Sequence, residues 1–342
     1  MRALACLAAI AWAFASSHAF AADEDAPNRK PVRAIADARL SVGGQGVLPL
    51  YLSSDWSMPL PAISRAIIML HGRLRNADEY YMSAHTAQLA AGDDGKSALM
   101  IVPQFLAEID VDAHKLPADT LRWSLEGWEG GDAALAPGPV SSFEALDAIL
   151  AKLADRRIFP NLKQVVVAGH SGGGQVAQRY AIAGRGETML SRQHIDVRYV
   201  VANPSSYAYF SNMRPVPAIA ASCPGFNNWK YGMDERPPYL ANVTPAALEQ
   251  RYVERDVIYL LGTLDTNPEH PALDKSCMAK AQGPYRYARG HAYVDAMAKR
   301  DRGTPRHRVW DIAGVGHDGD KMLTSKCGLA ALFDSPGCGA ER

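Results

Sequence analysis

The sequence has no excess of charge of one sign and no hydrophobic run long enough to cross a membrane. Its 342 residues carry 36 basic and 36 acidic side chains, so the basic surface typical of a nucleic-acid-binding protein is not expected. The longest apolar run near the N-terminus has 13 residues, Ala3 to Ala15, whereas a membrane-spanning helix needs about 20. We therefore expect neither a nucleic-acid partner nor a stable membrane anchor.

Internal repeats, low-complexity linkers and Cys-x-x-Cys pairs are also missing. The composition, 48% hydrophobic with 28 Gly and 22 Pro, is ordinary for a globular protein and excludes a collagen-like chain or a coiled coil. Without Cys-x-x-Cys pairs, a redox motif or a zinc knuckle is not expected. We predict one domain over residues 22–342, with no metal and no organic cofactor.

The first 21 residues have the three parts of a secretory signal peptide. A single Arg2 precedes the apolar run, and a small-x-small cleavage site follows at Ala19–Ala21. The alternative is a buried N-terminal helix. The signal-peptide interpretation predicts a secreted or periplasmic protein.

Export would remove Cys6 and leave four cysteines. An even number in an exported chain favours two disulfides, with three possible pairings. We favour Cys223–Cys277 and Cys327–Cys338, because the last two are only 11 residues apart and bracket the final predicted helix. Four free thiols are the alternative.

Apolar, β-rich runs alternate with helical patterns along the chain. This alternation predicts an α/β fold with a mostly parallel sheet covered by helices on both faces. Strands are expected at 66–71, 97–103, 164–168, 197–202, 257–261 and 308–312, after a hairpin at 40–53. Helices are expected at 76–91, 141–155, 173–184, 288–300 and 319–333.

One segment, about 204–255, breaks this alternation. Its first part, Pro204 to Tyr239, holds six prolines and many aromatic residues. We predict an irregular insertion over the carboxyl ends of the strands, where open α/β sheets bind ligands. A structural surface loop pinned by Cys223 is the alternative.

The strongest local signal is Gly-His-Ser-Gly-Gly over Gly169–Gly173, a G-x-S-x-G pattern centred on Ser171. An apolar strand enters the pattern and a helix leaves it. In this context the small residues allow a sharp turn that exposes the serine hydroxyl as a nucleophile. A phosphate-binding loop is the competing interpretation, but its glycine and lysine spacing is absent here.

A serine hydroxyl needs a base, and the base needs an acid to orient it. On this architecture the chain order is Ser, acid, His. Asp265 follows an apolar strand, and His317 ends a Gly-flanked loop after the next strand. Asp256 and Asp311 lie before or within strands, at the wrong end for the site. We predict Ser171, Asp265 and His317 as the catalytic residues.

The attacked carbonyl oxygen also needs hydrogen-bond donors. One predicted donor is the backbone N–H of Gly172, directly after the nucleophile. The second comes from the loop that begins at His71-Gly72. We predict the backbone N–H of Arg73, with Leu74 as the next choice.

On these motifs the sequence resembles the α/β-hydrolase superfamily, in its secreted serine esterase and lipase branch. The resemblance rests on His71-Gly72, Gly169–Gly173, Asp265 after Gly-Thr-Leu, and Gly316-His317. It implies acyl transfer through a serine-bound intermediate, with water as acceptor and without a metal or cofactor. The Pro- and aromatic-rich insertion departs from this resemblance, because we can assign it to no cap of the family.

The substrate pocket is expected near His170, Trp123 and Trp128, with the insertion's aromatic residues contributing an apolar wall. Packing in the core is the alternative for these aromatics. Arg73 and Arg75, beside the oxyanion loop, could favour a substrate carboxylate; solvent exposure or a salt bridge is the alternative. The leading functional hypothesis is hydrolysis of a small-molecule carboxylic ester, and the other is a peptidase, thioesterase or acyltransferase on the same fold. The sequence does not predict an oligomeric state.

Overall fold

The computed structural model describes residues 27–300 and 306–338, so the predicted signal peptide lies outside the described residues. An eight-stranded sheet, in the order β1-β2-β4-β3-β7-β8-β9-β10, forms the centre. Only β2 runs against its neighbours, and every other adjacent pair is parallel. The strands are β1 Ala38–Val42, β2 Gly46–Leu52, β3 Arg65–Leu70, β4 Ala98–Pro103, β7 Gln164–His170, β8 Asp196–Ala202, β9 Asp256–Gly262 and β10 His307–Ile312. A separate pair consists of β5 Leu106–Ala107 and β6 Arg122–Trp123.

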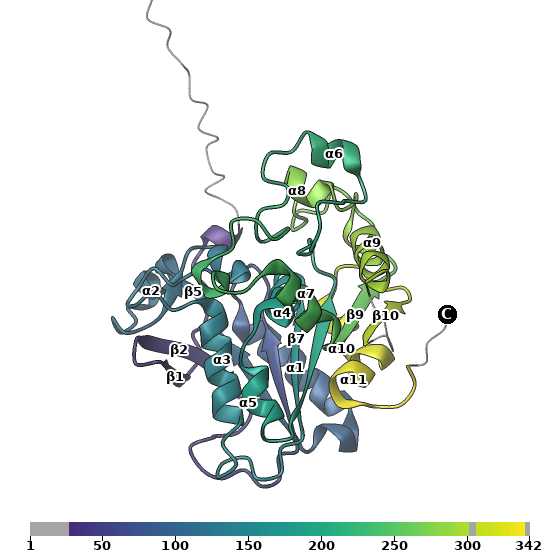
Figure 1. Ribbon diagram of the computed structural model, residues 1–342. Coiled ribbons are helices and arrows are strands. Elements are labelled where there is room, and N and C mark those ends of the chain that lie inside the picture. The colour runs from purple at the N-terminus through teal and green to yellow at the C-terminus, as the bar shows by residue number, and fades with distance from the viewer. Residues whose placement is uncertain (1–26, 301–305, 339–342) are drawn as a thin grey trace, which may run out of the picture.

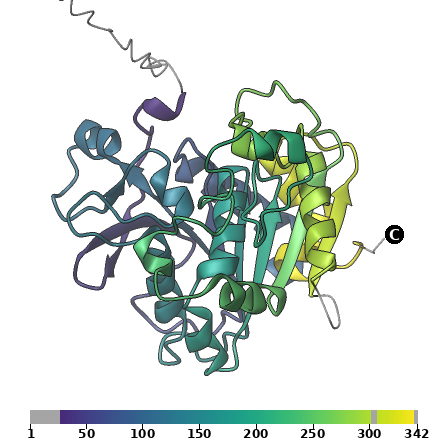
Figure 2. The same ribbon diagram turned by 45° about the horizontal axis from the view of Figure 1, so that its top comes forward.

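Helices cover the sheet on both faces, as Figure 1 and the tilted view in Figure 2 show. Successive residues of a strand point to opposite faces, so Val165 and Val167 join one apolar cluster and Val166 joins another. The first cluster contains residues of α3, α4, α7 and α9, and the second contains residues of α1, α10 and α11. The helices are α1 Ala77–Ala90, α2 Glu108–His114, α3 Ser142–Leu153, α4 Gly172–Ala183, α5 Glu187–Ser191, α6 Pro217–Ala221, α7 Pro245–Val253, α8 Cys277–Lys280, α9 Arg286–Ala298, α10 Gly319–Thr324 and α11 Lys326–Phe333. The predicted α/β class and two-faced sheet are confirmed.

The C-terminal helix predicted at 319–333 is in fact two helices. Ser325 is extended, with ψ of 159°, and its Oγ accepts a hydrogen bond from the backbone N–H of Gly328. Serine favours this capping conformation, so α11 begins anew after it. Both predicted disulfides form: Cys223 bonds to Cys277, and Cys327 bonds to Cys338.

The predicted insertion is irregular, with α6, a short 3-10 turn (Pro238–Leu240) and α7 as its only helical parts among the described residues. Its disulfide joins the end of α6 to α8, and these two helices lie together at the top of Figure 1. The tyrosines at 207, 209 and 239 are buried in the main core. Within the described part of the chain, no helix is long and apolar enough to cross a membrane.

Candidate active site

Ser171 stands at a sharp turn between the end of β7 and the start of α4. Its φ of 58° and ψ of −120° are unfavourable for a residue with a side chain. The flanking glycines make the turn possible: a Cβ on Gly173 would lie 2.0 Å from the carbonyl oxygen of Leu70. A Cβ on Gly169 would lie 2.3 Å from the backbone of Gly173. The glycine pattern is therefore required by close strand–helix packing.

His317 and Asp265 reach Ser171 from the two loops that follow β10 and β9. The Oγ of Ser171 is 2.9 Å from Nε2 of His317, and Nδ1 of His317 is 2.8 Å from Oδ2 of Asp265. Because β9 and β10 are adjacent parallel strands, their carboxyl ends bring both loops to one edge of the sheet. The structure thus joins the three predicted catalytic side chains in one hydrogen-bonded series, from Ser171 through His317 to Asp265.

Behind Asp265 lies a residue that the sequence analysis missed. Arg286, at the start of α9, is fully buried, and its Nη1 is 3.3 Å from Oδ1 of Asp265. It also donates to Oγ of Ser205 and to the carbonyl oxygen of Ala272. Nothing in the local sequence distinguishes this arginine from the others, because its partner is 21 residues away.

The surroundings shift the pKa values of the two ionisable partners. Burial lowers the pKa of His317 below its ordinary value, and the positive charge of Arg286 adds to this, while the hydrogen bond to Asp265 opposes it. Burial raises the pKa of Asp265, but the hydrogen bond to His317 and the charge of Arg286 outweigh it, so the net direction is down. Asp265 is therefore held ionised and His317 is held neutral to lower pH.

The two predicted oxyanion donors lie next to one another. A Cβ on Gly172 would be 2.9 Å from the backbone nitrogen of Arg73, so the two segments touch beside Ser171. Gly172 is the first residue of α4, and its N–H therefore has no acceptor within the helix. Arg73 and Leu74, from the loop after β3, both line the cavity at Ser171.

That cavity, which we call the groove, has a volume of about 1540 Å³. It contains Ser171 and His317 and extends along α1 to the hairpin of β1 and β2. His170 lies in its wall; the residue is 4% exposed, and its ring centroid is 4.6 Å from that of His317. Among the described residues that line the groove, none belongs to the insertion.

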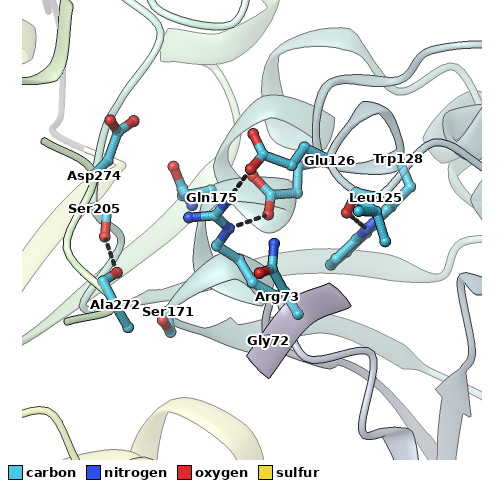
Figure 3. A network of polar contacts seen from close by, with 12 residues as sticks. Gly72, Arg73, Leu125, Glu126, Trp128, Ser171, Gln175, Ser205, Ala272 and Asp274 are labelled. Carbon is cyan, nitrogen blue, oxygen red and sulfur yellow. Dashed lines mark hydrogen bonds and ion pairs between the residues drawn. The ribbon is translucent and has the colours of Figure 1, made fainter. Parts of the chain in front are cut away.

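The predicted pocket residues Trp123 and Trp128 are core residues instead. Both are fully buried outside the groove. Trp128 stacks on Phe105 with ring centroids 5.4 Å apart. Its Nε1 donates to the carbonyl oxygen of Leu125, a hydrogen bond that Figure 3 shows. Trp123 packs edge-on against the same phenylalanine. Large indole side chains gain stability from burial, and here both are buried in the core and do not line the groove.

Arg75 is likewise not a substrate-binding residue. It is fully buried and bonds Asp110 through two nitrogens, at 2.6 Å and 3.0 Å. Further bonds go to the carbonyl oxygens of Asn28 and Lys30. The guanidinium ties the N-terminal segment to α2, so the prediction of a carboxylate-binding role for it is wrong.

The parallel sheet, the strained serine turn after β7 and the two-faced helical cover define the α/β-hydrolase fold. No protein-family model and no curated protein matches the sequence. Among solved structures, a poly(3-hydroxybutyrate) depolymerase from Bordetella parapertussis is similar, with a TM-score of 0.62 and 22% identity over 90% of this chain and 92% of that one. The poly(aspartic acid) hydrolase-1 of Sphingomonas sp. KT-1 has a TM-score of 0.61 and 19% identity over 89% of this chain and 99% of that one. At these identities the likeness establishes the fold.

Proposed function

We propose that the protein is a serine hydrolase that cleaves carboxylic esters through an acyl-enzyme intermediate. The observation that carries this proposal is the hydrogen-bonded series from Ser171 Oγ through His317 to Asp265. An isolated serine hydroxyl is a weak nucleophile, and this series supplies the base and its orienting acid. The two hydrolases with the same fold add support.

In the acylation step, Oγ of Ser171 attacks the ester carbonyl carbon while Nε2 of His317 accepts the hydroxyl proton. The carbonyl oxygen becomes an oxyanion, which the backbone N–H groups of Gly172 and Arg73 stabilise. The carbon–oxygen bond to the leaving alcohol then breaks, and His317 returns its proton to that oxygen. Asp265 holds the imidazolium through Nδ1.

In the deacylation step, water attacks the acyl group on Ser171 and gives its proton to His317. Collapse of the second oxyanion releases the carboxylic acid and returns the proton to Oγ of Ser171. The proposal also places the chain outside the cytoplasm. The two disulfides support this location, because such bonds persist in oxidising compartments.

The direct test is hydrolysis of p-nitrophenyl esters from acetate to laurate by the wild type and Ser171→Ala. We expect turnover by the wild type and a loss of about 10⁴-fold or more in kcat for the variant. The variant removes only Oγ, so an unchanged circular dichroism spectrum and Tm are the control for folding. Turnover that survives in Ser171→Ala would contradict the proposal. Ser171-dependent cleavage of anilides or thioesters, without ester turnover, would favour the peptidase, thioesterase or acyltransferase alternative.

A further inference from the structure

The groove is larger than a small ester requires. Pockets for single small ligands occupy about 300–1,000 Å³, and this one has about 1540 Å³. It continues from Ser171 past Tyr80 and Tyr81 of α1 to Tyr51 of β2. Part of a bound substrate would therefore lie well away from the scissile bond, where the groove's own side chains select it.

The charged side chains of the groove are mostly acidic. They come from α1, from the start of α10, and from the segments that flank the β1–β2 hairpin. The six acidic residues are Asp37, Asp55, Asp78, Glu79, Asp318 and Asp320, and the two cationic residues are Arg33 and Arg73.

Both arginines form ion pairs with carboxylates of the chain itself, which partly neutralises their charge. Arg33 pairs with Asp78 at 3.0 Å. Arg73 pairs with Glu126, toward which Figure 3 shows its guanidinium directed. It also pairs with Glu129 at 3.4 Å. The anions that Arg73 binds are thus two carboxylates of the chain itself, Glu126 and Glu129.

Most of the acids, by contrast, keep their charge uncompensated. Asp318 pairs with Lys321 at 3.0 Å. Asp37, Asp55, Glu79 and Asp320 form no ion pair with any residue that the structure describes. Their hydrogen-bond donors are neutral: Asn76 for Glu79, Ser83 for Asp320 and Ser57 for Asp55. A neutral donor does not cancel the negative charge of these exposed carboxylates, which line the groove.

Two side chains in the wall of the groove, Tyr51 and His170, are affected by their surroundings. Burial and the negative charges of Asp78 and Asp37 raise the pKa of Tyr51 to about 12. His170 is 4% exposed, and its Nε2 is buried without a hydrogen-bond partner among the described residues.

We propose that the groove selects esters that carry positive charge beyond the scissile bond, such as an alkylammonium group on the acyl chain. This inference rests on the proposed function and specifies its substrate class. The uncompensated acids attract a cation along the groove and repel an anion. A polyanion such as poly(aspartic acid), which names one of the structural neighbours, is therefore a poor substrate for this chain.

Three p-nitrophenyl esters of matched size test the charge preference. They are the 4-(trimethylammonio)butanoate, the neutral isostere 5,5-dimethylhexanoate and the glutarate hemiester. We expect kcat/KM, corrected for each ester's hydroxide-catalysed rate, to be about tenfold or more higher for the cation than for the anion at low salt. The ratio should fall toward one at about 0.5 M salt, where charges are screened within a few ångströms.

Substitution of the groove acids separates their effect from overall charge. Glu79→Gln combined with Asp320→Asn removes two groove charges but keeps each side chain's size. Asp93→Asn combined with Glu254→Gln removes two exposed charges outside the groove, one of them paired with Lys96, and is the control for net charge. We expect the groove variant to lose most of the cation preference, measured as the ratio of kcat/KM for the cationic and neutral esters, and the control variant to keep it.

Equal kcat/KM for the cationic and anionic esters at low salt would overturn the inference, as would equal losses in the groove and control variants. Ser171-dependent cleavage of the neutral ester would still support the proposed function in that case. Equilibrium binding of the same esters to Ser171→Ala tests the charge preference without the chemistry. There the cation is expected to have the lower Kd, and the reverse order would also overturn the inference.

Discussion

Arg286 places a fixed positive charge behind Asp265, and this extends the three predicted catalytic residues to a series of four. The guanidinium is fully buried and is also held by Ser205 and Ala272, so its position is fixed. It keeps Asp265 ionised and, with burial, lowers the pKa of His317. Arg286 therefore lowers the pKa of the proposed base from a position outside the residues that line the groove.

This arrangement predicts the pH dependence of ester hydrolysis. His317 must be neutral to accept a proton, and its lowered pKa keeps it neutral below the ordinary histidine value of about 6.5. The acid limb of kcat/KM is therefore expected below that pH. Arg286→Met removes a positive charge, which raises the pKa of His317 and moves the limb to higher pH, whereas Arg286→Lys keeps it low.

Thermal unfolding of the same variants separates positioning from stability. Loss of one partner of a buried ion pair costs about 3–5 kcal/mol, so a lower Tm is expected for Arg286→Met. If the Tm falls while the acid limb stays in place, Arg286 stabilises the fold only, and the account of its role is wrong.

The elements that carry the site were predictable because their signals are local. The β-branched run of β7, the glycines after it and the regular strand–helix alternation all lie within short stretches of sequence. Burial of Trp123, Trp128 and Arg75 in the core could not be predicted from the local sequence. Each depends on a partner brought close by the fold, such as Phe105 or Asp110. Arg286 was missed for the same reason, because its partner Asp265 is 21 residues away in the sequence.

Helix α4 packs closely against β3 and β7, and Gly173 lies at this contact. A Cβ at Gly173 would lie 2.0 Å from a backbone oxygen, which cannot rotate away. We expect Gly173→Ala to lower the free energy of unfolding by about 1–3 kcal/mol or more, as measured by urea denaturation. Gly316→Ala is the control, since its Cβ would meet nothing closer than 3.7 Å. Equal stability of the two variants would contradict the packing account.

Acidic and basic side chains are unevenly distributed over the molecule, which the balanced composition does not show. The chain is neutral overall, yet six acidic and only two cationic side chains of the described residues line its groove. Other cations pair with acids outside the groove. Arg65 and Arg198, for example, both bind Asp334 just after α11. These pairs tie the C-terminal end of the described chain to β3 and β8.

Asp334 therefore links stability to pH. Burial raises its pKa, but the hydrogen bond and charge of Arg198, together with Arg65, lower it overall. Its contribution is present above the unfolded value of about 3.9 and is lost as the pH falls through the folded value. Asp334→Asn should lower the free energy of unfolding at pH 7 by about 1 kcal/mol and flatten its decline below pH 4. An unchanged acid-unfolding curve would contradict this role.

If Ser171 is the nucleophile, it carries the acyl group between the two steps, and acid-quenched mass spectrometry detects that intermediate. After brief reaction with p-nitrophenyl acetate, we predict one added acetyl group on the peptide that contains Ser171. The adduct should be absent in Ser171→Ala and strongly reduced in His317→Ala. Turnover without an acetylated Ser171, or acetylation at another residue that accounts for the turnover, would contradict the account.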